Sequence, residues 1–144
     1  MNKITFVVPS WGHLNNPLTH QPYWEMYYST IIRNTLKKEE LEFEVTISDN
    51  RGNKKLIDNI DKSDFFLYWI FKTPEATECF KCVKELKSKY PKSIHIAGGT
   101  HVEKSPDECV KIFDSIVVGP GEKSFVNAIK DWSFKNGSKI YKNK

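Results

Sequence analysis

Residues 94–122, IHIAGGTHVEKSPDECVKIFDSIVVGPGE, decide the fold because they alternate apolar runs with glycine turns. The apolar run at 94–97 predicts a strand that ends at Gly98 and Gly99. A Gly-Gly pair permits a sharp turn and lets another group approach the backbone closely. A second buried strand is expected at 116–118, and the glycine turn at 119–122 then opens another helix.

A short helix is expected between these two strands. Ser105 is the predicted N-cap, Pro106 suits the first helical position, and Glu108 would complete a capping box. Strand, helix and strand in this order are typical of a parallel sheet with helices packed on its faces. The stretch therefore predicts an α/β fold.

The rest of the chain continues the same alternation. Further strands are expected at 4–8, 43–48 and 65–71, and further helices at 23–38, 56–60, 73–90 and 122–132. Five strands alternating with five helices predict a doubly wound, flavodoxin-like parallel sheet in the order 2-1-3-4-5, with helices on both faces. We expect this domain to occupy residues 1–132, and residues 133–144 to form a polar linker or disordered tail.

This strand order predicts where a ligand would bind. The order reverses between the first and third strands, and ligands of doubly wound sheets bind outside the carboxyl ends of the strands at such a switch point. Five loops would meet there and form one rim: 10–22, 49–52, 72–74, 98–104 and 119–122. The first of these is longer than the ~2–6 residues usual after a strand, which favours a functional role.

Composition excludes several classes of function. Of 22 basic residues only Arg33 and Arg51 are arginine, and the lysines are dispersed, which argues against a nucleic-acid-binding protein. No apolar run approaches the ~20 residues that span a bilayer, and the first residues show no signal-peptide pattern. We therefore expect a cytoplasmic protein with no membrane partner.

The cysteines do not predict a disulfide framework or a metal site. There are three, Cys79, Cys82 and Cys109, and the C-x-x-C pair falls in the middle of a predicted helix. We interpret them as core or surface residues. Nor does the sequence contain a Ser–His–Asp order, a phosphate loop, or the C-x-x-x-C-x-x-C motif of radical enzymes. Catalysis within this chain is therefore not expected.

The glycine turns resemble those that end the cobalamin-binding domain found in front of many radical S-adenosylmethionine enzymes. The positions that match its G-G-x-H turn, P-E-x helix and V-x-G-x-G-E turn are Gly98, Gly99, His101, Pro106, Gly119, Gly121 and Glu122. Asp107, Thr100 and Pro120 depart from the residues usual there. By element order the resemblance extends over residues 3–132. It implies a module that holds a corrinoid while a separate radical catalytic domain or protein performs the chemistry.

The resemblance also implies a set of cofactor-binding residues on the rim. These are Trp11, Gly12, His13, Ser48, Thr73, Gly98, Gly99, Thr100, His101, Gly119, Gly121 and Glu122. His13 is the candidate axial ligand of cobalt, although its surroundings lack the D-x-H-x-x-G pattern, and Trp11 could instead cover the lower corrin face. The glycines would leave room for the nucleotide tail, or they form ordinary tight turns.

Two other readings stay open at this point. A cofactor-free interaction domain of the same fold would dock on a partner enzyme or self-associate, for instance through the region of Trp11, Tyr23 and Trp24. A flavin- or nucleotide-binding enzyme of flavodoxin type would need a Ser/Thr-rich phosphate loop after the first strand, where Ser10 stands alone.

Overall fold

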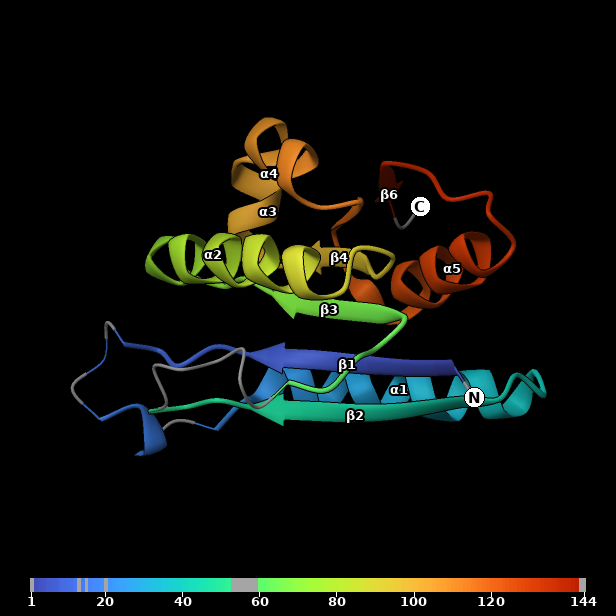
Figure 1. Cartoon of the computed structure of the whole chain (residues 1–144), viewed down its shortest axis with the longest axis horizontal. Coiled ribbons are helices and arrows are strands. Elements are labelled where there is room, and N and C mark those ends of the chain that lie inside the picture. The colour runs from blue at the N-terminus through green and yellow to red at the C-terminus, as the bar shows by residue number, and fades with distance from the viewer. Residues whose placement is uncertain (1, 13, 15, 20, 53–59, 143–144) are drawn as a thin grey trace.

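The chain forms a six-stranded parallel sheet with helices on both faces (Figure 1). These elements come from a computed structural model that describes residues 2–12, 14, 16–19, 21–52 and 60–142. The strands are β1 (Asn2–Val8), β2 (Phe43–Asp49), β3 (Phe65–Trp69), β4 (Ile94–Gly98), β5 (Ser115–Val118) and β6 (Ile140–Lys142). The helices are α1 (Tyr23–Lys38), α2 (Thr73–Lys89), α3 (Thr100–Lys104), α4 (Pro106–Ile112) and α5 (Gly121–Ser133), with a 3₁₀ turn η1 (Pro17–Thr19).

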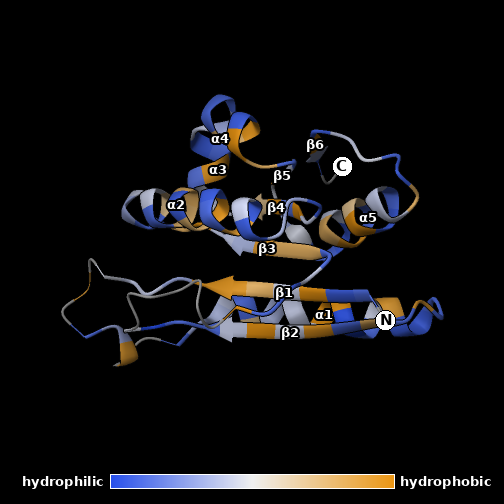
Figure 2. Ribbon diagram, in the orientation of Figure 1, coloured by the Kyte–Doolittle hydropathy of each residue, from blue (hydrophilic) through white to orange (hydrophobic). Residues whose placement is uncertain are grey.

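The strand order β2-β1-β3-β4-β5-β6 confirms the predicted α/β class and its switch point between β1 and β3. Alternate residues of β3 point to opposite faces. Phe65 and Leu67 pack with α1 and α5, whereas Phe66 and Tyr68 pack with α2, α3 and α4. Figure 2 shows the resulting concentration of apolar residues in β1 and β3. Burial on both faces explains why these strands show no polar alternation.

The prediction of five strands was wrong, because a sixth lies within the segment 133–144 that was expected to be a linker or tail. β6 pairs in parallel with β5, with Ile116 opposite Ile140 and Val118 opposite Lys142. Further hydrogen bonds hold it in place: Tyr141 donates to the Asp131 carboxylate at 2.9 Å, and the Ile116 N–H donates to the carbonyl of Lys139, just ahead of the strand, at 2.8 Å. Long-range contacts therefore stabilise a strand of only three residues.

The helix after β4 also begins differently from the prediction. A first short helix, α3, starts directly after Gly99, and Ser105 both ends it and precedes α4. The Ser105 N–H donates to the carbonyl of His101 at 2.9 Å, while the Ser105 side chain makes no capping bond. The predicted capping box between Ser105 and Glu108 is therefore wrong. The helix expected at 56–60 falls, apart from Ile60, outside the described residues.

A buried polar cluster lies beneath α2. His95 on β4 is fully buried, and its Nδ1 shares a hydrogen bond of 2.8 Å with the hydroxyl of Tyr68. Its Nε2 has no partner among the described residues. Cys79 and Cys82 pack in the same core, and burial raises the pKa of the Cys82 thiol to about 12. The cysteines are therefore core residues and not surface residues; the sequence had left both placements open.

His95 should make the fold sensitive to acid. Burial lowers its pKa from 6.5 to about 4, so the unfolded chain takes up a proton at a higher pH than the folded one. The free energy of unfolding should therefore fall by on the order of 3 kcal/mol as the pH drops from 6.5 to 4. Urea titrations across this range should show a smaller fall for His95→Asn, which does not titrate. Equal pH dependence in both proteins would contradict the prediction.

Candidate functional site

The loop after β1 is fixed to α2 at the switch point. Glu78 of α2 accepts a hydrogen bond from the Ser10 N–H at 2.6 Å and a second from the Ser10 hydroxyl. Trp11 follows with a φ of 53°, a conformation uncommon for residues other than glycine. On the other side, the Asn50 side chain donates to the carbonyl of Val8 at 3.1 Å. The described start of this loop is thus held by both neighbouring segments.

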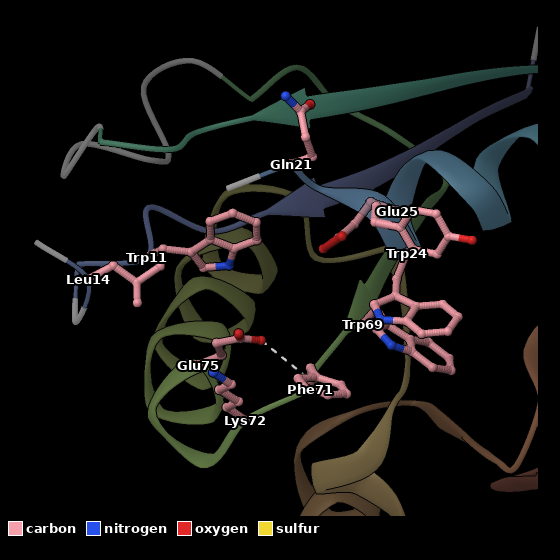
Figure 3. A pocket seen from close by; sticks show the side chains of 10 residues that line it. Trp11, Leu14, Gln21, Trp24, Glu25, Trp69, Phe71, Lys72 and Glu75 are labelled. Atoms are coloured by element: carbon pink, nitrogen blue, oxygen red, sulfur yellow. Dashed lines mark hydrogen bonds between the residues drawn. The ribbon is translucent and has the colours of Figure 1, made fainter. Parts of the chain in front are cut away.

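A pocket opens at this switch point and encloses a cavity of about 250 Å³ (Figure 3). It lies between the loop after β1, the start of α1, the end of β3 and the start of α2. Ten residues line it: Trp11, Leu14, Gln21, Tyr23, Trp24, Glu25, Trp69, Phe71, Lys72 and Glu75. We call it the switch-point pocket. The predicted location of the site, outside the carboxyl ends of β1 and β3, thus coincides with a cavity.

Half of the residues that line the pocket are aromatic. The ring centroids of Trp24 and Trp69 are 5.6 Å apart, and those of Tyr28 and Trp69 are 4.5 Å apart. Tyr23 meets Trp24 edge to face at 5.2 Å. The Trp69 Nε1 is buried and has no hydrogen-bond partner among the described residues. Aromatic contacts of this kind favour fixed ring positions, so the wall is preformed.

Glu25 brings a buried carboxyl group to this wall. It lies in the first turn of α1, is only 4% exposed, and points into the cavity (Figure 3). Burial is the main cause that raises its pKa to about 7; the hydrogen bond from its own backbone N–H opposes this rise, and the nearby charges of Glu75 and Asp49 add to it. A shifted carboxyl group in a cleft is a common mark of a functional site.

Glu75 lies across the pocket in the first turn of α2. Its carboxylate accepts a hydrogen bond from the Phe71 N–H at 3.1 Å, which ties the helix start to the segment after β3. Lys72, the N-cap residue of α2, also lines the pocket and is exposed. The pocket thus combines apolar walls with two carboxyl groups and one ammonium group.

The structure separates the predicted site residues into several groups. Trp11 lines the switch-point pocket, and Gly12 follows it on the surface. His13, the predicted cobalt ligand, lies outside the described residues. Ser48 accepts a hydrogen bond from the side chain of Asn50 at 3.0 Å, so it belongs to the turn after β2. Only Trp11 of these four can be placed in the pocket.

Thr73, Thr100 and His101 lie where three helices meet. His101 is buried, and its two ring nitrogens lie 3.3 Å from the Thr73 hydroxyl and 3.5 Å from the Glu108 carboxylate. The imidazole therefore joins α2, α3 and α4. Thr100 is the first residue of α3 and is half-buried. This arrangement gives His101 a structural role and leaves Thr73 on the exposed side of the junction.

The glycines of the two turns differ in what surrounds them. A Cβ at Gly99, whose φ is 112°, would stand 2.4 Å from the Ile70 carbonyl oxygen. A Cβ at Gly98 would meet the Trp69 ring at 2.9 Å, and one at Gly121 would meet Phe125 at 2.7 Å. Close packing within the protein therefore explains why glycine stands at these three positions.

Gly119 faces open space instead. Its φ is 92°, and a Cβ there would find no atom within 4 Å. Glu122, three residues later, accepts a hydrogen bond from the Tyr27 hydroxyl at 3.0 Å and so links α5 to α1. Of the glycine turn that follows β5, Gly119 is thus the position from which a ligand could approach the backbone.

Several residues of the switch-point pocket were not among the predicted site residues: Glu25, Trp69, Phe71, Lys72 and Glu75. Glu25 did leave a signal in the sequence. The buried face of α1 contains Glu25, Tyr28, Ser29, Ile32 and Leu36. A carboxyl group on the stripe that faces the core departs from the helical pattern, and this departure could have singled it out.

Comparison with known proteins supports the fold and no more. No protein-family model matches the chain, and neither does any curated protein. Among solved structures, the chain is similar to the crystal structure of the N-terminal domain of the hypothetical protein TM0182 from Thermotoga maritima. The TM-score is 0.59 at 22% identity, and the match covers 79% of this chain and 88% of that one. At this identity the likeness shows the α/β fold alone.

Removing the Glu25 charge should stabilise the protein at alkaline pH. Because the folded state holds the Glu25 proton more tightly than the unfolded state, stability is lost as the pH rises from 4.5 to about 7. At pH 8, Glu25→Gln should therefore be more stable than the natural protein by on the order of 3 kcal/mol, with a smaller difference at pH 4.5.

Urea titrations at the two pH values measure this effect. Glu44→Gln, which removes an exposed carboxylate on β2, is the matched control and should change stability little at either pH. If the stability of Glu25→Gln relative to the natural chain is the same at pH 4.5 and at pH 8, burial does not disfavour the charged form of the Glu25 carboxyl group.

Proposed function

We propose that this chain is a corrinoid-binding module that carries cobalamin on the carboxyl edge of its sheet, while a separate radical S-adenosylmethionine domain or protein acts on the substrate. The observation that carries the proposal is the meeting of two features at that edge. The glycine turns that resemble those of cobalamin-binding domains follow β4 and β5, and the aromatic pocket opens at the β1/β3 switch point. Ligands of doubly wound folds bind at such an edge.

The rim residues fit a flat, largely apolar macrocycle in part. Phe71 is 44% exposed and would supply apolar contact surface, whereas Trp11 is only 8% exposed. The cavity of about 250 Å³ is smaller than the ~300–1,000 Å³ usual for drug-sized ligands. A corrin ring would therefore lie across the rim and not inside the pocket. When bound, cobalamin would supply a cobalt centre for alkyl-group or radical chemistry.

The glycine turns fit the nucleotide tail at one position. Gly98, Gly99 and Gly121 are enclosed by the protein's own atoms, whereas Gly119 faces open space. We therefore place the tail over Gly119, at the start of α5. Helix N-termini favour phosphate groups, which supports this placement, although the Gly121 N–H is already bonded to Tyr28 at 3.3 Å.

The alternative function is that of a cofactor-free interaction domain that docks on a partner enzyme. An exposed aromatic patch at the start of α1 favours it. Tyr23 is 62% exposed, and Trp24, Met26 and Tyr27 expose more than a third of their surface beside it. Aromatic residues and methionine are enriched in protein interfaces. Under this alternative, the patch would bind the partner and the rim would stay empty.

Reconstitution with hydroxocobalamin tests the proposal directly. The protein is mixed with the corrinoid at concentrations well above micromolar and separated by gel filtration. Corrin absorbance that elutes with the protein is the expected result. Complete loss of that absorbance from the protein fraction would reject corrinoid binding and leave the interaction domain as the better reading.

A substitution at Gly119 should separate ligand contact from backbone strain. Gly119→Val places a branched side chain into the open space and should weaken corrinoid binding, while its positive φ costs on the order of 1–3 kcal/mol of stability. Gly52, with φ 77° and no atom within 4 Å of its Cβ position, offers a matched control in the turn after the edge strand β2.

Both variants are measured by thermal melting and by corrinoid retention. Gly52→Val should lose comparable stability and should bind corrinoid more tightly than Gly119→Val, because it carries the same kind of strain after β2, which is separated from β5 by three strands of the sheet. If Gly119→Val folds and retains cobalamin as well as Gly52→Val does, the tail does not pass over Gly119.

A further inference from the structure

The switch-point pocket contains a buried carboxyl group that forms no ion pair with a basic side chain among the described residues. This residue, Glu25, is 4% exposed. Within the described part of the chain, its carboxylate accepts a hydrogen bond from the N–H of its own backbone. Buried carboxylates are normally paired, because an unpaired charge in an apolar site is costly. A cation from outside the protein would supply the missing partner.

The acidic groups around Glu25 increase this demand for a cation. Glu75 of α2 and Asp49 at the end of β2 both act on Glu25 through their charge. Asp49 is itself bound by the guanidinium of Arg51 at 2.8 Å, so its charge is largely compensated. Lys72 is the basic residue in the described lining, and it is exposed at the pocket mouth. The interior of the pocket therefore favours positive charge.

The walls of the pocket are suited to a particular kind of cation. Trp11, Trp24, Trp69 and Phe71 lie around the space into which Glu25 points (Figure 3), and Tyr23 also lines the pocket. Faces of tryptophan and tyrosine rings attract ammonium groups within about 6 Å, and aromatic cages of this type recognise quaternary ammonium ions. A metal ion would instead need several oxygen or nitrogen ligands, and the described residues provide no group of three His, Cys, Asp or Glu side chains placed to hold one.

We propose that the switch-point pocket binds a small organic cation of the quaternary-ammonium class, with the aromatic rings as its cage and Glu25 as its counter-ion. The cavity of about 250 Å³ lies below the usual range for drug-sized ligands, which suits a head group of this size. The inference goes beyond corrinoid binding and does not depend on it, since the pocket interior is too small for a corrin ring.

A pair of matched probes tests the role of charge. Choline and its uncharged isostere 3,3-dimethylbutan-1-ol have the same shape, because a carbon atom replaces the nitrogen. Each is titrated into the full chain at pH 8, with binding followed by calorimetry and by tryptophan fluorescence. We expect choline to bind saturably and at least about tenfold more tightly than the isostere, since only choline gains the ion pair and the cation–π contacts.

Two variants then assign the preference to named groups. Glu25→Gln keeps the shape of the side chain and should weaken choline binding towards that of the isostere, with the cation–π contacts left in place, whereas Glu44→Gln, on the exposed part of β2, should leave choline affinity unchanged. Trp24→Leu keeps the side chain apolar but removes its ring, and should weaken choline binding by roughly threefold to thirtyfold.

Three results would overturn the inference. These are the absence of choline binding at millimolar concentration, equal binding of choline and the isostere, and undiminished choline affinity in Glu25→Gln. The hydroxocobalamin experiment is independent of all three, because it reports on the rim and the Gly119 turn. Failure of one proposal can therefore be told apart from failure of the other.

Discussion

The ends of β3 and β4 are joined by a backbone contact that only glycine permits. Ile70 donates a hydrogen bond to the carbonyl of Gly98 at 2.8 Å and accepts one from the N–H of His101 at 3.0 Å. Between these two bonds, the missing side chain of Gly99 lets the chain pass against the Ile70 carbonyl. Any Cβ at Gly99 would break this arrangement, because backbone atoms cannot move aside as a flexible side chain can.

Much of the candidate site depends on this contact. Trp69 and Phe71 flank Ile70 in the chain, so fixing Ile70 also fixes two aromatic residues of the pocket wall. On the β4 side, the same contact places the start of α3 and directs His101 towards Thr73 and Glu108. The turn at Gly98 and Gly99, which we expected to contact a ligand directly, thus shapes the pocket indirectly, because it fixes the position of Ile70.

The fold was largely predictable because most strands are buried on both faces. Continuous apolar runs such as 65–71 leave few alternatives to a central parallel strand. β6 escaped prediction for a physical reason. Ile140 and Tyr141 lie in a lysine-rich segment, and the bonds that hold the strand come from distant residues such as Ser115. A segment that is stabilised by tertiary contacts carries little local signal.

The location of the site followed from topology, whereas its chemistry did not. The strand order alone places a ligand at the β1/β3 junction. The reason for each glycine could not be predicted. A glycine that is required by close contact with Ile70 and a glycine that is required by close contact with a ligand look the same in the sequence. The carboxyl group of Glu25 was likewise hidden in a helix that otherwise follows the apolar pattern. It shares the pocket with residues from distant parts of the chain, such as Trp69 and Glu75, which the pattern of the helix does not reveal.

The direction of β6 has a practical consequence for attaching other proteins to this domain. Lys142 pairs with Val118, so it lies at the carboxyl ends of the strands, next to the Gly119 turn. Asn2 is the first residue of β1 and lies at the amino ends of the strands. With a rise of about 3.3 Å per residue, the seven residues of β1 separate these ends by roughly 20 Å. A reporter protein fused behind residue 142 would sit beside the ligand edge and respond to its occupancy. The same reporter fused ahead of residue 2 would leave that edge uncovered.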